Sequence, residues 1–382
     1  MKYFQNEKST KFEKFEEYFI AITLVLANIG FSEYLSVAFF TIIYLIFKKN
    51  KNNFFSLNNI SLILVLFISF AVYGIELILS KPSEFLLHSI LSHGRECLMI
   101  FITYSYINNN KNIKFNEKVI DVLLIILGVI LLIQYAQITL EIKPFSLSKE
   151  YYMIQYESLL NDNYNLGYDR LRPTAFYSEP SVLSCIFVPL LYIFLHKNEN
   201  FKVLLCCVLI IFSGSAYGYI GMILVLLNFL YKQKNNQQKN IIYTTFFLVV
   251  LLNFGYEYLE ERLIKILEFD DMSYAWRFTY PLDYFKDKYL DSDFYAQHVR
   301  FLIEYGSNVY EASIFDTWPL YTLAKLGLVH GTIWIIFSYF LFHKLFWTIF
   351  FYTLVSGAPF YHDKVLLLMI IGGVIVQMNK KL

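Results

Sequence analysis

The sequence predicts an all-α, polytopic membrane protein with about twelve transmembrane helices, on three observations. First, the chain of 382 residues is 57% hydrophobic and only 16% charged, whereas soluble domains carry roughly 25% charged residues. Second, runs of about 20 apolar residues recur along almost the whole length, which is typical of helices that cross a bilayer. Third, the lysines cluster between alternate runs, where the positive-inside rule places cytoplasmic loops.

These patterns predict one integral membrane domain, residues 1–382, with both termini in the cytoplasm. The basic segment Met1–Lys14 precedes an apolar stretch without a small-residue cleavage site, so we expect no cleavable signal peptide. The predicted spans are residues 17–31, 33–47, 60–80, 87–107, 119–140, 179–195, 202–214, 216–231, 241–256, 327–343, 345–356 and 364–378.

Two pairs of spans are unusually short. Residues 18–47 are too long for one ordinary span and short for two, and lysines at both ends favour a tight hairpin around Gly30 and Ser32. Spans seven and eight are joined by Ser213-Gly214-Ser215, a turn that we expect below the outer surface and buried in protein.

The cysteines give no sign of a metal site or a disulfide. All four fall in apolar spans without metal-ligand spacing, so packing roles are favoured: Cys97, Cys185, Cys206 and Cys207. We expect no metal, no cofactor and no nucleic-acid partner.

Two external loops are predicted, at residues 141–178 and 257–326. The second is long enough to form a small domain. Its start, Tyr256–Leu267, repeats apolar residues at helical spacing, which predicts an amphipathic helix on the membrane surface.

The arginines fall on one side of this topology. The 18 basic residues of the cytoplasmic clusters are all lysine, and the six arginines all lie on the external side. A guanidinium is a planar fork that grips phosphate oxygens in pairs. We therefore expect an anionic, phosphorylated substrate at the outer face. The six are Arg95, Arg170, Arg172, Arg262, Arg277 and Arg300.

The sharpest segment, residues 170–181, reads Arg-Leu-Arg-Pro-Thr-Ala-Phe-Tyr-Ser-Glu-Pro-Ser and leads into an apolar span. Pro180 suits the first turn of a helix, where a missing N–H costs nothing, and Glu179 and Ser181 would cap that helix. The alternative interpretation is that the arginines merely lie at an interface and that the helix dipole favours the acid.

Two later segments complete the pattern. Arg277 lies in Asp-Met-Ser-Tyr-Ala-Trp-Arg-Phe within the large loop, and Asp316 lies just before span ten. An unpaired carboxylate is costly there, so Arg172 and Arg277 are its candidate partners.

The order of these segments resembles the Wzy-type polysaccharide repeat-unit polymerases, which are relatives of the O-antigen ligases. The resemblance covers residues 120–345. It comprises the arginine pair with Phe-Tyr-Ser-Glu-Pro-Ser, then Phe-Ser-Gly-Ser-Ala-Tyr-Gly before a helix, then an arginine in a large outer loop, then Leu-Ala-Lys-Leu-Gly. It implies a GT-C-like helical scaffold in the bacterial inner membrane with a sizeable periplasmic loop. It also implies polymerisation of oligosaccharide units carried on undecaprenyl diphosphate.

The resemblance implies that Arg170 or Arg172, together with Arg277, holds the lipid diphosphate or the acceptor. Arg300 and Tyr177 are further candidate binding residues. The ligases place a catalytic histidine where Asp316 is the nearest match here, and Ala216 stands where they have an arginine, which favours a polymerase. Candidate bases are Asp316, Glu179 and His298. The partners implied are membrane lipid, the lipid-linked oligosaccharide, a chain-length regulator and a flippase.

Other features have plainer interpretations. Loop tyrosines and Trp276 could stack on sugars or form an aromatic belt. Arg95 and Glu96 are predicted to form a local ion pair, with a lipid-diphosphate role for Arg95 as the alternative, and the histidines other than His298 are predicted to be interface residues.

Three rival functions remain open. A ligase would move finished glycan to another acceptor. A transporter or flippase would be expected to carry repeats and midplane ionisable residues, which the sequence does not indicate. A membrane acyltransferase would need a histidine–acid arrangement in a span, and the sequence does not indicate one either.

Overall fold

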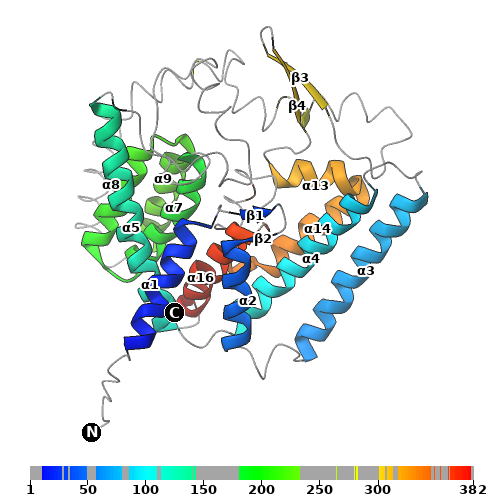
Figure 1. Ribbon diagram of the computed structural model, residues 1–382, viewed down its shortest axis with the longest axis horizontal. Helices are drawn as coiled ribbons and strands as arrows, with labels where there is room; N and C mark the ends of the chain where they lie inside the picture. The colour runs from blue at the N-terminus through cyan, green and yellow to red at the C-terminus, as the bar shows by residue number, and fades with distance from the viewer. Residues whose placement is uncertain are drawn as a thin grey trace.

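The protein is nearly all helical in the computed structural model (Figure 1). The structure describes residues 11–27, 30–32, 35–49, 57–79, 86–109, 113–140, 142, 180–232, 264, 279, 281–282, 301–305, 308–312, 317–345, 348, 353, 360 and 362–379. By length and composition, two of the described helices could cross a membrane, over Ile60–Ile78 and Lys114–Thr139, and six others are apolar but shorter.

Ten of the twelve predicted spans coincide with helices in this described part of the chain. They are α1 (Lys11–Val25), α2 (Val37–Lys49), α3 (Leu57–Leu79), α4 (Leu86–Asn109), α5 (Ile113–Thr139), α7 (Pro180–His196), α8 (Asn200–Ser213), α9 (Ala216–Lys232), α14 (Leu328–Leu341) and α16 (His362–Asn379). The predicted span 241–256 and most of 345–356 lie outside the described residues.

The first predicted pair is a hairpin, but its details differ from the prediction. Strands β1 (Gly30–Ser32) and β2 (Leu35–Ser36) pair antiparallel between α1 and α2. Helix α1 begins six residues earlier than the predicted span, because its first turns contain lysine and glutamate, which are good helix formers. A tight hairpin joins α1 to α2, as predicted, and α1 extends beyond the predicted span on its N-terminal side.

Helix α16 is the centre of the bundle. It packs against α1, α2, α4, α5 and α7, and every residue from Val365 to Val376 is buried. A helix that is apolar on all sides is expected in such a position. Its apolar residues belong to the described hydrophobic core.

Ion pairs tie the lysine-bearing helix ends together. Lys48 at the end of α2 pairs with Glu16 of α1, and Lys118 of α5 pairs with Glu17 at 3.2 Å. Around the α7–α8 junction, Lys197 pairs with Glu117 at 3.0 Å. These ion pairs lie at the end of the molecule where α1 begins and α2 ends (Figure 1), which we call the lysine-rich end.

The opposite end carries the remaining described elements. Helix α13 (Trp318–Leu326) lies across this end and turns into α14 at Gly327. Above it, β3 (Phe301–Tyr305) and β4 (Asn308–Ala312) pair as an antiparallel hairpin (Figure 1). The all-α class is confirmed, since the described strands form only two short hairpins, one of them within the large loop 257–326. The amphipathic helix predicted at the start of that loop lies almost wholly outside the described residues.

Candidate functional site

The residues that the sequence singled out lie outside the part of the chain that the structure describes. This holds for the candidate bases and for the candidate binding residues: Asp316, Glu179, His298, Arg170, Arg172, Arg277, Arg300 and Tyr177. The described chain resumes directly beside two of them, at Pro180 and at Thr317. Pro180 and Thr317 are therefore the described residues that lie next to predicted site residues in the sequence.

Two of the segments that carry the resemblance meet at the end opposite the lysine-rich end. Helix α7 begins at Pro180, as predicted, and its 17 residues run toward Lys197. The predicted turn between α8 and α9 is also present, since Gly214 has a left-handed φ of 60° and closes α8. A Cβ built on Gly218 would lie 2.7 Å from Oγ of Ser184, so this glycine allows α9 to approach α7 closely.

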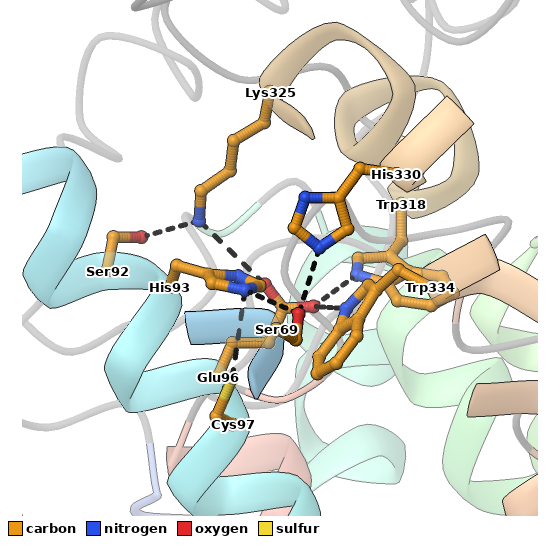
Figure 2. A network of polar contacts seen from close by, with 9 residues as sticks. All are labelled: Ser69, Ser92, His93, Glu96, Cys97, Trp318, Lys325, His330 and Trp334. Atoms are coloured by element: carbon orange, nitrogen blue, oxygen red, sulfur yellow. Dashed lines mark hydrogen bonds and ion pairs between the residues drawn. The ribbon is translucent and has the colours of Figure 1, made fainter. Parts of the chain in front are cut away.

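A buried carboxylate organises a second cluster, which involves the third segment. Glu96 of α4 accepts hydrogen bonds on Oε1 from Nε1 of Trp318 at 2.9 Å and Nε1 of Trp334 at 3.1 Å. Both indoles are almost fully buried. Figure 2 shows the two rings converging on Glu96 from α13 and α14. Two donors on one oxygen fix this carboxylate in place.

The cation of this cluster is Lys325, the lysine of Leu-Ala-Lys-Leu-Gly. Its Nζ donates to Oγ of Ser92 at 3.2 Å and lies 3.8 Å from Oε2 of Glu96. The lysine and glutamate side chains are only 8% and 13% exposed. The rings of Tyr73 and Tyr321 lie within 6.0 Å of the ammonium group, close enough for cation–π attraction. The expectation that Glu96 pairs locally with Arg95 is not supported, because the carboxylate faces Lys325 and two indoles.

Two histidines and a serine continue the cluster. Oγ of Ser69, on α3, lies 3.2 Å from Nε2 of His93 and 3.0 Å from Nε2 of His330. Nδ1 of His330 lies 3.3 Å from Oε2 of Glu76. His93 is completely buried. The prediction that the histidines other than His298 are interface residues is therefore wrong for His93.

We call these residues the polar cluster: Ser69, Glu76, Ser92, His93, Glu96, Cys97, Trp318, Lys325, His330 and Trp334 (Figure 2, which omits Glu76). Its depth follows from helix geometry. His93 lies about two turns, or about 10 Å, along α4 from Leu86, and Glu96 lies about one turn further. The cluster is thus set inside the helical bundle, below α13.

Sequence reasoning missed this cluster although a signal was present. Ser92, His93, Glu96 and Cys97 are spaced to share one face of α4 in an otherwise apolar span. Ionisable residues within a span indicate a functional site by default. Their partners come from positions more than 200 residues away, so spacing within α4 alone could not identify them.

The chemistry of the cluster is set by its carboxylates, its ammonium group and its imidazoles. No group of three or more His, Cys, Asp or Glu residues able to hold a metal ion occurs in the described segments. The arrangement can instead hold a fixed carboxylate, present a buried ammonium group and pass protons between imidazoles. Comparison of the chain with protein-family models, with curated proteins and with solved structures gave no match.

Proposed function

We propose that this protein is a bacterial inner-membrane polymerase that joins undecaprenyl-diphosphate-linked oligosaccharide units into surface polysaccharide. The observation that carries the proposal is spatial. The described parts of three segments with polymerase-like sequence, which begin at Pro180, Phe212 and Leu323, all lie at the end opposite the lysine-rich end. A substrate site shared by segments so distant in sequence would be expected at one end of the bundle.

The membrane orientation in this proposal follows the positive-inside rule. Lysine-rich ends face the cytoplasm, so the polar cluster and the large loop face the periplasm. The ion-paired lysines Lys48, Lys118 and Lys197 lie at the same end of the bundle, which supports this orientation. Multiple crossings with both termini in the cytoplasm belong to the same proposal.

The proposed reaction needs no metal. A hydroxyl of one lipid-linked unit attacks the anomeric carbon of the growing chain, a new glycosidic bond forms, and the bond to the diphosphate breaks. The hydroxyl proton passes to a base, for which Asp316 is the first candidate, and the electron pair leaves with the diphosphate. Arg172 and Arg277 stabilise the charge that develops on that diphosphate.

Lys325 gives the proposal a described cation near the same end. Its ammonium group is buried and has three N–H donors, and two of them face Ser92 and Glu96. In the proposal it fixes α13 against α4. Asp316 lies two positions before Trp318 in the sequence, so this anchor would also restrain the approach of the candidate base.

A transporter of the lipid-linked unit is the second candidate, because one observation favours it. Transporters use ionisable residues within their membrane helices, and the structure contains such residues in Glu96, His93 and His330. Sequence analysis did not detect this feature. A ligase remains the alternative within the same reaction class.

The decisive experiment uses the purified full-length protein in proteoliposomes with a synthetic lipid-diphosphate oligosaccharide. A ladder of longer products is expected for a polymerase. Unchanged material delivered across the vesicle would indicate a transporter, and a single transfer to another acceptor would indicate a ligase.

The arginines can be tested in the same assay. Arg172→Ala and Arg277→Ala are each expected to abolish the ladder because the diphosphate loses its bidentate partner, and lysine at either position should restore only part of the activity. Arg262→Ala is the control from the same loop and should keep the ladder. A normal ladder from Arg277→Ala would remove that residue from the site.

A further inference from the structure

The hydroxyl group of Ser69 links two imidazoles that come from helices far apart in sequence. Its Oγ lies 3.2 Å from Nε2 of His93 and 3.0 Å from Nε2 of His330 (Figure 2). The second nitrogen of His330 faces Glu76 at 3.3 Å. Four side chains from α3, α4 and α14 thus form a continuous line of hydrogen bonds.

Donor and acceptor chemistry gives this line one direction when Glu76 is ionised and His330 is neutral. The carboxylate then only accepts hydrogen bonds, so the proton of His330 is on Nδ1, toward Glu76. Its Nε2 is then a bare acceptor, and Ser69 donates to it. The serine oxygen in turn accepts from His93, whose proton is therefore on Nε2. This leaves Nδ1 of His93 with an unprotonated lone pair.

That lone pair is the unusual feature of the site. Nδ1 of His93 is buried and has no hydrogen-bond partner among the described residues. Leaving a buried acceptor unsatisfied is unfavourable, so such groups are rare in folded proteins. A base with its lone pair free in a polar cluster is suited to receive a proton from a bound molecule.

We propose that His93, Ser69, His330 and Glu76 form a proton relay from an O–H group bound at Nδ1 of His93 to the partly exposed Glu76. When Nδ1 takes up a proton, the proton on Nε2 moves to the oxygen of Ser69. The original hydroxyl proton moves to Nε2 of His330. The proton on Nδ1 of His330 then moves to Glu76, so one proton enters and one leaves. The original direction of the hydrogen bonds is restored when the proton transfers run in reverse or when the imidazole rings rotate.

The relay explains where the positive charge would reside. A charge on His93 would be fully buried, and the ammonium of Lys325 lies in the same cluster. Transfer through Ser69 moves that charge to His330, which contacts the carboxylate of Glu76. The thiol of Cys97 and the rings of Tyr73 and Trp334 also lie beside His93. The favoured position for the charge is beside Glu76, whose side chain is 31% exposed to solvent.

A serine nucleophile is a less suitable interpretation of the same geometry. In the directed line, the hydroxyl proton of Ser69 is donated to one imidazole and its oxygen accepts from the other. Both functions of the hydroxyl are therefore engaged in hydrogen bonds. A group that donates and accepts at once is a natural element of a proton-transfer chain.

The identity of the O–H group rests on the proposed function. In a polymerase it is the acceptor hydroxyl, or a water molecule hydrogen-bonded to it, and His93 then takes the place of Asp316 as the base that receives the proton released as the glycosidic bond forms. The hydrogen-bond direction itself depends only on the side chains described above. The two claims can therefore fail separately.

The first test measures the tautomers by ¹⁵N NMR of the purified, full-length protein with labelled histidine, without substrate. At neutral pH the proton is expected on Nε2 of His93 and on Nδ1 of His330, with signals assigned from His93→Asn and His330→Asn. Ser69→Ala should change the ¹⁵N chemical shifts of both rings. Ser105→Ala removes a buried hydroxyl on α4 and should change neither ring's shifts. A proton on Nδ1 of neutral His93 would overturn the relay, whatever the protein's activity.

The second test measures the polymerisation rate. Ser69→Ala should lower it by about 10²-fold, within the range of general base catalysis. Ser69→Thr should recover much of that loss, and Ser105→Ala should leave the rate unchanged. A ladder formed at the normal rate by Ser69→Ala would overturn the relay and leave the polymerase intact. Covalent modification of Ser69 by a fluorophosphonate would also overturn it, by identifying a nucleophile.

Discussion

The two ends of this molecule use charge in different ways. At the lysine-rich end, Lys202 pairs with Asp121 at 2.6 Å and with Glu199 at 2.6 Å, and these side chains are 30–39% exposed. In the polar cluster, Lys325 and Glu96 lie 3.8 Å apart with side chains 8% and 13% exposed. The ion pairs of Lys202 have shorter distances and more exposed side chains. The pair of Lys325 and Glu96 has a longer distance, is more buried and is enclosed by aromatic rings.

This difference separates two roles for ion pairs. An exposed pair gains about 0–1 kcal/mol because water already solvates both charges. A buried pair gives up several kcal/mol of solvation for each ion, so it adds little net stability, yet losing one partner is severe. We infer that the lysine-rich end is tolerant of substitution. In the polar cluster, in contrast, we infer that the charged residues serve a function rather than the stability of the fold.

The largest expected effect comes from removing the buried carboxylate. Glu96→Ala would leave Lys325 without its carboxylate and the indole N–H groups of Trp318 and Trp334 without their acceptor. We expect a loss of about 3–5 kcal/mol of stability, the usual result of leaving a buried charge unpaired. Thermal unfolding in detergent, compared with the unaltered protein, measures this loss.

A double-variant cycle sharpens the result. Glu96→Gln removes the charge but keeps an acceptor, and Lys325→Met removes the other charge at similar length. The combined variant should be more stable than the sum of the two single losses predicts, because no unpaired charge remains. Strictly additive losses would show that Glu96 and Lys325 do not depend on each other.

A smaller effect is expected where α13 meets α14. A Cβ built on Gly331 would lie 3.0 Å from the backbone of both Thr322 and Leu323, whereas one built on Gly74 of α3 meets nothing within 4 Å. Overpacking outweighs the helix preference of alanine at the first site, so Gly331→Ala should destabilise by about 1–2 kcal/mol. Gly74→Ala should stabilise by up to about 1 kcal/mol. Equal melting temperatures for the two variants would contradict the close packing that holds Lys325 in place.

Local patterns account for what the sequence could predict. Apolar runs located most helices, Pro180 marked the start of α7, and Ser213-Gly214-Ser215 marked the turn before α9. Each of these signals is contained within a few residues. Lysine clusters lie between alternate apolar runs, and this spacing likewise predicted that these lysines would lie at one end of the bundle.

The polar cluster could not be predicted in the same way. Glu96 and Trp318 are 222 positions apart, and Ser69 and His330 are 261 apart. Their contact depends on which helices are neighbours and how each is rotated, and neither can be read from hydropathy. Glu96 was paired in the prediction with its sequence neighbour Arg95, because the sequence contains no information about the approach of α13. The hairpin of β3 and β4 was missed for a different reason, since short strands within a polar loop have no strong periodic signal.

The smallest effect is expected at the lysine-rich end. Lys202→Met removes the cation that joins α8 to Asp121 of α5, but all of the groups involved are partly hydrated. We expect a change in stability of less than about 1 kcal/mol. Raising the salt concentration should reduce this change further, because exposed charges are screened, whereas salt should scarcely alter the effect of Glu96→Ala. A loss at Lys202 as large as that at Glu96 would mean that burial does not distinguish the two ends.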